Sequence, residues 1–417
     1  MQLKGFTILM TLILCYSNVL SQFKPNDTAL YEAYPIINQQ AVKLIGDSIA
    51  FQEFASKLHS FTTANHPAFH VLHIGDSHVQ AGFFTEPIRE LFSSIYGYGG
   101  PGVVFPYQVA KTNGPPGFSS SSDYTWTAKR NVKYNIPLPT GLCGHTIYST
   151  NPSASFNIRF NEDSSYNRIR NLTIFHSNRD TNFNYIVTGD DSIIAHMDSS
   201  FQDIRATRFI FSKDVSRIRV SNNKTDSKQV SSTITGMYCN NGNSNTAITS
   251  VIGVNGARYN DYMSSDWFIE QVSLVAPQLI ILSLGTNESF EYNKLNLTQF
   301  ASTIDSMVSR LKHLPSMPII LLTTPPAVCR SKRVSKRIIY IPNTYTALVR
   351  QVILDQAAKN HLLSFDLYEA MGGEKSMKWW ALKHMTDKRQ IHFTKPAYRI
   401  SGSLLASALA RLMENQK

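Results

Sequence analysis

The chain has 417 residues, 42% of them hydrophobic, and its 40 Lys and Arg against 29 Asp and Glu give a formal net charge of +11. This length allows two domains or one large domain with an insertion, and the apolar content argues against a disordered chain. The basic charge favours attraction to anionic polymers or lipid headgroups. Because no nucleic-acid-binding motif is present, we do not expect nucleic acid as a partner.

The N-terminus predicts a targeting segment. A short apolar run at residues 6–14 is too short to span a bilayer and fits the hydrophobic part of a secretory signal peptide. Val19 and Ser21 supply the small residues of a cleavage site. We therefore expect residues 1–21 to be removed and the mature chain to be periplasmic or at the cell surface. No later segment is long and apolar enough to cross a membrane.

Three cysteines would remain after this removal, namely Cys143, Cys239 and Cys329. Three cysteines cannot all pair, so the chain is not a disulfide scaffold, although one bridge is compatible with the count. Their spacing matches no zinc motif.

Residues 26–63 and 85–96 have the spacing of amphipathic helices. The first is expected to pack beside the main domain as an N-terminal extension, with buried positions at Val42, Leu44, Ile45, Ile49, Phe51 and Phe54. Between the two helices, an apolar run ends in Gly75-Asp76-Ser77, which indicates a buried strand with a serine at its C-terminal end. Open α/β sheets place their chemistry at that edge. Ser77 is therefore a candidate site residue, although Gly-Asp-Ser is also an ordinary turn sequence.

Residues 105–245 have a different pattern. Short alternating segments recur at 155–160, 168–175, 184–187, 208–211, 216–220 and 232–237, separated by turn-forming residues. Many short strands at this spacing are typical of a β-sandwich or jelly roll. We therefore predict an inserted β-sandwich domain. The insertion resembles a carbohydrate-binding module, and this resemblance implies exposed aromatic residues for sugar binding among Tyr124, Trp126 and Tyr134, although Tyr and Trp in strands more often belong to the core.

Strands and helices alternate after residue 246. Strand-like runs at 247–252, 279–284, 318–323 and 362–365 are interleaved with helical patterns at 266–275, 297–311, 345–358 and 397–412. This alternation predicts a parallel sheet sandwiched by helices. Residues 22–104 and 246–417 are thus expected to form one α/β domain. The densest basic cluster, residues 330–337, is expected to be a solvated loop of this domain.

Four short motifs place functional groups after predicted strands or loops in a fixed order: Gly75-Asp76-Ser77, then Gly256 in SVIGVNGAR, Asn287 in GTNE and His392 in QIHFT. This order of serine, glycine, asparagine and histidine resembles the SGNH (GDSL-type) hydrolase family. The resemblance spans residues 69–412 apart from the insertion. It implies a three-layer, flavodoxin-like α/β fold and a carboxylic ester hydrolase without a metal or organic cofactor. With the insertion, the chain resembles peptidoglycan O-acetylesterases and polysaccharide acetylesterases that carry a carbohydrate-binding-like β-domain.

The resemblance also implies a role for each motif residue. Ser77 would be the nucleophile, and His392 would be the base that takes its proton. The backbone N–H groups of Ser77 and Gly256, with the side-chain amide of Asn287, would form the oxyanion hole.

The third catalytic residue departs from the family pattern. The family carries an aspartate three residues before the histidine, where this chain has Arg389. Asp387, five residues before His392, is the candidate acid, and a Ser–His dyad is the alternative. Arg389 is either a surface residue or a contact for an anionic substrate. Two smaller departures are His78, where the type pattern has leucine, and Glu288 after Asn287, where many members have aspartate.

The sequence therefore predicts an exported serine esterase that removes O-acetyl groups from a polysaccharide, with peptidoglycan preferred, through an acyl-enzyme. One alternative is another SGNH carboxylesterase, a lipase or a plant-polysaccharide acetylesterase with the same site residues. The other is a catalytically inactive glycan-binding surface protein, which Arg389 at the acid's usual position favours. The oligomeric state cannot be read from the sequence.

Overall fold

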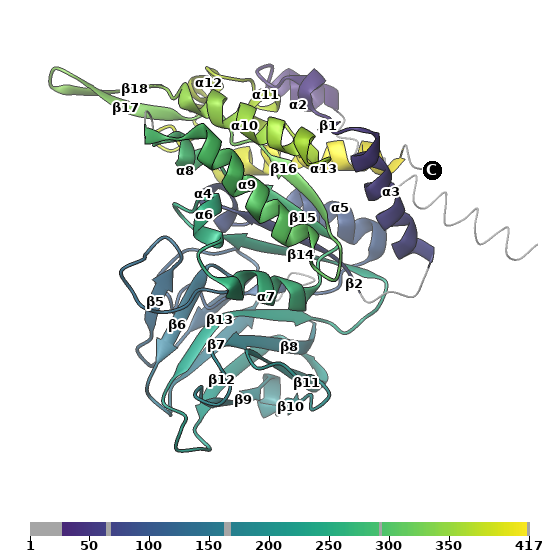
Figure 1. The fold of residues 1–417 in the computed structure, drawn as a ribbon, viewed down its shortest axis with the longest axis vertical. Coiled ribbons are helices and arrows are strands. Elements are labelled where there is room, and N and C mark those ends of the chain that lie inside the picture. The colour runs from purple at the N-terminus through teal and green to yellow at the C-terminus, as the bar shows by residue number, and fades with distance from the viewer. Residues whose placement is uncertain (1–26, 64–67, 162–167, 292–293, 415–417) are drawn as a thin grey trace, which may run out of the picture.

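The computed structural model describes residues 27–63, 68–161, 168–291 and 294–414, so the predicted signal segment lies outside the described residues. Figure 1 shows a layered α/β part above a group of antiparallel strands. Among the described helices, none combines the length and apolar character needed to cross a bilayer.

The α/β part is built on a six-stranded sheet. Its strands lie in the order β1 (Leu44–Ile45), β19 (Leu363–Phe365), β16 (Ile319–Thr323), β15 (Leu279–Ser283), β2 (Ala68–Gly75) and β14 (Thr246–Gly253). All pairs are parallel except β1 with β19. The five parallel strands are almost wholly buried, as expected for a parallel sheet covered on both faces. The predicted α/β class with a parallel sheet is confirmed.

Helices cover the sheet on two sides, and each side has its own apolar cluster. One cluster joins the sheet to α3 (Ser48–Thr63), α5 (Glu86–Tyr96), α11 (Leu367–Ala370), α12 (Ser376–Leu382) and α13 (Lys395–Glu414). The other joins it to α7 (Asp266–Val275), α9 (Leu297–Lys312) and α10 (Tyr345–Lys359). Side chains of β2 alternate between the clusters, because successive residues of a strand point to opposite faces.

The N-terminal extension is not the single helix predicted over residues 26–63. It consists of α2 (Asp27–Ala33), the 3-10 turn η1 (Gln39–Ala41), β1 and α3. Leu44 is buried as expected, but Ile45 and Ile49 are 43% and 45% exposed. For Ile45 the reason is tertiary: Leu44 pairs with Phe365 at the sheet edge, which gives residues 44–45 the alternating burial of a strand, whereas Ile49 lies in α3.

The predicted inserted β domain is confirmed as two antiparallel sheets. The larger contains β10 (His196–Met197), β11 (Ala206–Val215), β8 (Ile169–His176), β13 (Ser232–Asn240), β6 (His145–Ser149) and β5 (Thr127–Arg130), with β3 (Gly102–Val104) paired to β13. The smaller contains β4 (Phe118–Ser121), β7 (Ser155–Phe160), β12 (Arg217–Asn223) and β9 (Asn184–Thr188). Trp126, named above among the aromatics for sugar binding, is only 6% exposed and packs on Phe156, whereas Tyr134 is 65% exposed.

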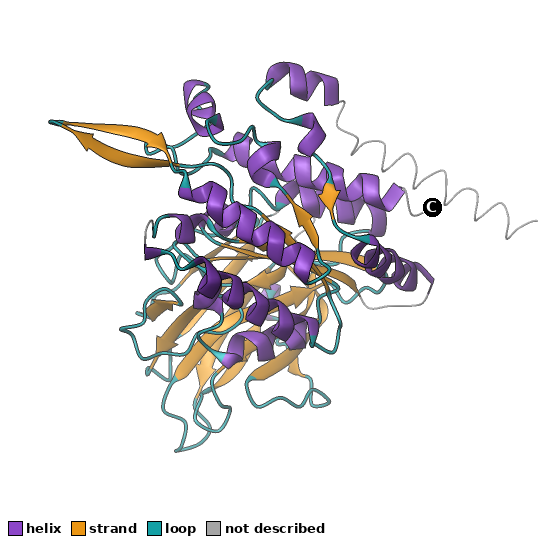
Figure 2. Ribbon diagram, turned by 45° about the horizontal axis from the view of Figure 1, so that its top comes forward, coloured by secondary structure: helices purple, strands orange, loops and turns teal. Residues whose placement is uncertain are grey.

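The basic cluster at residues 330–337 is not a loop. It forms a hairpin of β17 (Cys329–Val334) and β18 (Arg337–Pro342) that extends away from the α/β part in both views (Figures 1 and 2). Most of its side chains are solvent-exposed, in keeping with the expected solvation. The three cysteines at 143, 239 and 329 are buried and free.

The carboxyl edge of the parallel sheet positions the site. Gly75 at the end of β2 pairs in register with Gly253 of β14 and with Ser283 of β15. The segments that follow these three strands carry the first three sequence motifs, and therefore meet at one edge.

Candidate active site

Ser77 stands at a tight junction between strand and helix. β2 ends at Gly75, and α4 (Ser77–Gln80) begins two residues later. Asp76 caps this helix, its carboxylate accepting a 2.9 Å hydrogen bond from the His78 N–H. A Cβ at Gly75 would lie 2.3 Å from Val79 Cγ2 and 2.7 Å from the Ser283 carbonyl oxygen. Only glycine permits this close approach, which places Ser77 at the N-terminus of α4.

His392 reaches Ser77 from the loop before α13. Its Nε2 lies 2.9 Å from Ser77 Oγ. The loop is closed by hydrogen bonds from the Asp387 N–H to the His392 carbonyl oxygen (2.8 Å) and from the Gln390 N–H to the Asp387 carbonyl oxygen (3.0 Å). Gln390 has a left-handed φ of 57°, which lets the chain turn back on itself.

Asp387 lies on the opposite side of the His392 ring. One carboxylate oxygen is 3.3 Å from Nδ1, and the other accepts hydrogen bonds from the N–H groups of Ile391 (3.0 Å) and His392 (3.3 Å). Burial raises the pKa of this carboxyl, but these hydrogen bonds outweigh it and hold the pKa below its ordinary value. Compared with the family pattern, two more residues separate Asp387 from His392, and the turn at Gln390 accommodates them.

Arg389 occupies the sequence position where the resembled family has its acid. Its side chain is 66% exposed, and its Nε lies 3.6 Å from Asp387 Oδ2. Arg389 also lines the pocket around Ser77. The pocket therefore presents one exposed cation beside the serine and histidine.

The other predicted site residues line the same pocket, a cavity of about 530 Å³ that contains Ser77, Gly256, Asn287 and His392. Gly256 has a φ of 90°, and a Cβ built there would meet nothing within 4 Å. Among the described residues, no acceptor is found for the backbone N–H of Ser77 or of Gly256. Two backbone donors are thus available to a ligand in this pocket.

Asn287 lies on the short helix α8 (Thr286–Ser289), which follows β15. Its side-chain amide donates to the Ala257 carbonyl oxygen at 2.9 Å and to Asp76 Oδ2 at 3.3 Å. Burial raises the pKa of Asp76 to about 7. Both hydrogen bonds of the Asn287 amide are to protein acceptors, and the one to Asp76 is the longer and weaker of the two.

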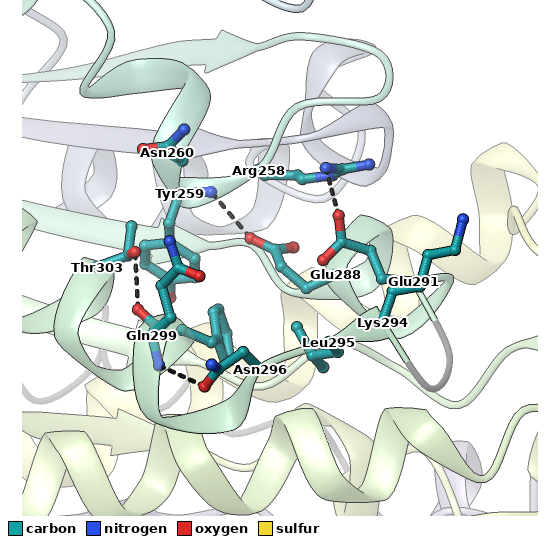
Figure 3. A pocket seen from close by; sticks show the side chains of 11 residues that line it. Arg258, Tyr259, Asn260, Glu288, Glu291, Lys294, Leu295, Asn296, Gln299 and Thr303 are labelled. Carbon is teal, nitrogen blue, oxygen red and sulfur yellow. Dashed lines mark hydrogen bonds and ion pairs between the residues drawn. The ribbon is translucent and has the colours of Figure 1, made fainter.

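Glu288, one of the residues that depart from the type pattern, connects two segments that line the site. Its Oε1 accepts a 2.9 Å hydrogen bond from the Tyr259 N–H (Figure 3). This bond links the segment after Asn287 to the segment after Gly256. Burial raises the pKa of Glu288 to about 8. Glu288 and Tyr259 also line a separate, small cavity of about 240 Å³. At the wall of this cavity, Arg258 and Glu291 form an ion pair of 2.5 Å (Figure 3).

Tyr398, Asn113 and Asn255 also line the pocket, and sequence reasoning missed all three. The Tyr398 hydroxyl lies 3.0 Å from His78 Nδ1, and the His78 ring lies 5.4 Å from the His392 ring between centroids. Burial lowers the pKa of His78 to about 3, which keeps this ring neutral behind His392. Tyr398 lies in the first two turns of α13, so its position six residues after His392 was a usable signal.

The described residues contain no group of three or more His, Cys, Asp or Glu side chains placed to hold a metal ion. The buried histidines instead bond to neighbouring hydroxyl or carbonyl groups. His73, for example, lies 2.8 Å from Thr85 Oγ1 and 2.8 Å from Ser283 Oγ.

A model of the GDSL-like Lipase/Acylhydrolase family matches residues 227–400. The chain carries a GDSL-like acylhydrolase domain. The match includes Gly256, Asn287, Asp387 and His392 and begins after Ser77. The acylhydrolase domain places the chain among the carboxylic ester hydrolases.

A solved structure with a similar fold extends the comparison to most of the chain. A peptidoglycan O-acetylesterase matches with a TM-score of 0.73 and 20% identity, over 89% of this chain and 99% of that chain. A lipase/acylhydrolase from Enterococcus faecalis matches at 19% identity over 40% of this chain and 77% of that chain, with a TM-score of 0.30. An acetyl xylan esterase matches at 15% identity over 39% and 81%, with a TM-score of 0.31. The comparison with curated proteins finds no match.

Proposed function

We propose that this chain is an exported serine esterase that removes O-acetyl groups from a polysaccharide, with peptidoglycan as the preferred substrate. The observation that carries the catalytic part is the alignment of Ser77, His392 and Asp387. The serine oxygen lies 2.9 Å from one ring nitrogen, and the carboxylate lies 3.3 Å from the other. This is the geometry in which a histidine can take a proton from serine while an acid holds its tautomer.

In this proposal Ser77 Oγ attacks the acetyl carbonyl carbon while His392 Nε2 takes the hydroxyl proton. Asp387 accepts the Nδ1–H hydrogen bond and stabilises the imidazolium; its lowered pKa keeps it ionised at neutral pH. His392 then gives the proton to the departing sugar oxygen, which leaves an acetylated Ser77. Water activated by the same ring attacks the acetyl carbon, and acetate and free Ser77 are released.

The negative oxygen of the tetrahedral intermediate would be bound by preorganised donors. The backbone N–H groups of Ser77 and Gly256 supply two of them. We assign the third to the Asn287 N–H that faces Asp76, since its 3.3 Å contact is the weaker of the two that this amide makes. The 2.9 Å bond to Ala257 would keep the amide oriented.

Three observations support a glycan as the substrate. The peptidoglycan O-acetylesterase shares this fold over nearly its whole length, the net charge is +11, and residues 1–21 have a signal-peptide pattern. We propose that the inserted β part helps to hold the glycan. Because Trp126 is buried, this contact would depend on other residues than the aromatic set expected from the sequence.

The test is acetate release by the mature protein from 4-nitrophenyl acetate, O-acetylated peptidoglycan and acetylated xylan, each compared with Ser77→Ala. We expect the serine variant to be at least about 10³-fold slower, since it lacks the nucleophile. Faster release from xylan than from peptidoglycan would refute the substrate while leaving the mechanism standing. A wild type no faster than Ser77→Ala on all three would favour the inactive glycan-binding alternative.

A further inference from the structure

A second cavity opens beside the candidate active site. It has a volume of about 700 Å³ and shares Asn113 and Asn255 with the pocket around Ser77. Apart from Asn255, its walls come from the inserted part, through residues 110–113 and 128–130, Lys133, Asn135, Ile136 and His145. The two cavities therefore adjoin at these asparagines, where the Asn255 side-chain amide donates a 2.9 Å hydrogen bond to Asn113 Oδ1.

The charged side chains of this cavity all have one sign. Lys111, Lys129, Arg130 and Lys133 line it, and no Asp or Glu does. None of these four forms an ion pair with a carboxylate of the described residues, whereas cations elsewhere, such as Arg350 with Asp366, do. Lys129 donates to the Leu138 carbonyl oxygen, which fixes its ammonium group. Lys111 and Lys133 are exposed, so their charges are free to meet a ligand.

His145 adds a polar atom at the wall of the cavity. The residue is 1% exposed, and its Nδ1 lies 2.9 Å from the Cys143 carbonyl oxygen, so Nδ1 carries the proton. Its Nε2 has no hydrogen-bond partner in the described part of the chain. Burial and, to a smaller extent, Arg130 lower the pKa of His145 to about 4, which keeps Nε2 an acceptor at neutral pH.

We propose that this cavity is a subsite for a carboxylate of the substrate, carried on the same glycan as the ester that reaches Ser77. Four cations without a competing acid favour an anion, and lysine and arginine bind carboxylates through charge-assisted hydrogen bonds. The inference rests on the proposed esterase function and narrows its substrate to an acidic, O-acetylated glycan. Two sources supply the same chemistry: an acid group on a sugar, or one on a peptide attached to the sugar.

The experiment compares Lys111→Gln/Lys133→Gln with Lys224→Gln/Lys228→Gln, a control pair that loses the same charge from exposed positions outside this cavity. The kcat/KM is measured on O-acetylated peptidoglycan strands with their peptides, on the same strands after an amidase has removed the peptides, and on 4-nitrophenyl acetate. We expect the ratio of strand to 4-nitrophenyl acetate activity to fall roughly tenfold or more in the cavity pair, through KM, and to stay unchanged in the control pair. Lys111→Arg/Lys133→Arg keeps both charges and should retain the ratio.

The outcomes separate the two sources. Amidase cleavage removes the peptide carboxylates and leaves a free carboxylate on the sugar. A loss confined to the untreated strands therefore assigns the carboxylate to the peptide, a loss confined to the treated strands assigns it to the sugar, and a loss on both shows that the subsite accepts either. Equal ratios in the cavity and control pairs on both strands overturn the proposal. If the wild type shows no esterase activity, the proposed function has failed, and the subsite is then judged by the calorimetric Kd of the strands, which should still rise about tenfold in the cavity pair only.

Discussion

The two halves of the candidate active site are supported in opposite ways. Ser77 follows a buried strand, and Asp76 beside it is only 1% exposed. His392 and Asp387 stand on a turn whose side chains are each 30% exposed, next to Arg389 at 66%. The proposed nucleophile is thus held by the core of the sheet, whereas the proposed base and acid are held by a few hydrogen bonds within one loop. Substitutions of the buried residues that hold Ser77 should act on folding, and those in the loop of His392 and Asp387 on activity.

Asp387→Asn should give the largest change, and in activity alone. An asparagine cannot stabilise the imidazolium and favours the wrong ring tautomer, so kcat should fall about 10³- to 10⁴-fold. The hydrogen bonds from Ile391 and His392 to the retained side-chain oxygen should hold the loop. Steady-state kinetics on 4-nitrophenyl acetate and a thermal melt measure the two effects.

Arg389→Gln is the matched control, because it removes the other charge beside the ring. A small change in Arg389→Gln with a large one in Asp387→Asn would assign the acid's role to residue 387. If Asp387→Asn kept most of its activity, a Ser–His dyad would be the better description.

Gly75→Ala tests the rigid side and should act on folding. The new methyl group would lie 2.3 Å from Val79 Cγ2 and 2.7 Å from the backbone oxygen of Ser283, so the strand or α4 would have to shift. Forcing such an overlap in a packed core typically costs about 1–3 kcal/mol, and more where backbone must shift. We expect a lower unfolding midpoint in urea and a smaller soluble yield. A wild-type midpoint would show that the junction is more adaptable than its contacts indicate.

The same contrast explains what the sequence could predict. Strands, helices and the order of the four motifs follow from local apolar periodicity and from the rule that parallel strands end at one edge. The pairing of Leu44 with Phe365 joins residues far apart in the chain, so the helical pattern over residues 26–63 was misleading there. The cavity of Lys111, Lys129 and Lys133 is likewise lined by β5 and by loops that meet only in the folded chain, so no spacing in the sequence predicts it.

The acid sensitivity of the rigid side gives a third test. Burial lowers the pKa of His73 from 6.5 to about 3, so the folded state keeps this ring neutral while the unfolded chain takes up a proton below pH 6.5. Its contribution to stability is therefore present above pH 6.5 and is lost as the pH falls towards 3. Between pH 7 and pH 5, the free energy of unfolding should fall by about 2 kcal/mol less in His73→Gln than in the wild type. Urea midpoints across this range, measured for the wild type, His73→Gln and the exposed control His196→Gln, give the dependence of stability on pH. Equal pH dependence in all three proteins would contradict the assignment.

Gly256→Ala should produce the smallest effect, because this residue faces the pocket and not the core. A methyl group there would meet no atom within 4 Å, so the cost comes only from the φ of 90°, which side chains other than glycine rarely adopt. Such strain destabilises the folded state by about 1–3 kcal/mol where the surrounding structure maintains it, and by less where the loop can relax. Relaxation would move the N–H that we assign to the oxyanion, so kcat should fall about tenfold or more while KM changes little. If stability fell without a change in kcat, Gly256 would serve the turn alone, and the oxyanion would have to be bound by Ser77 and Asn287.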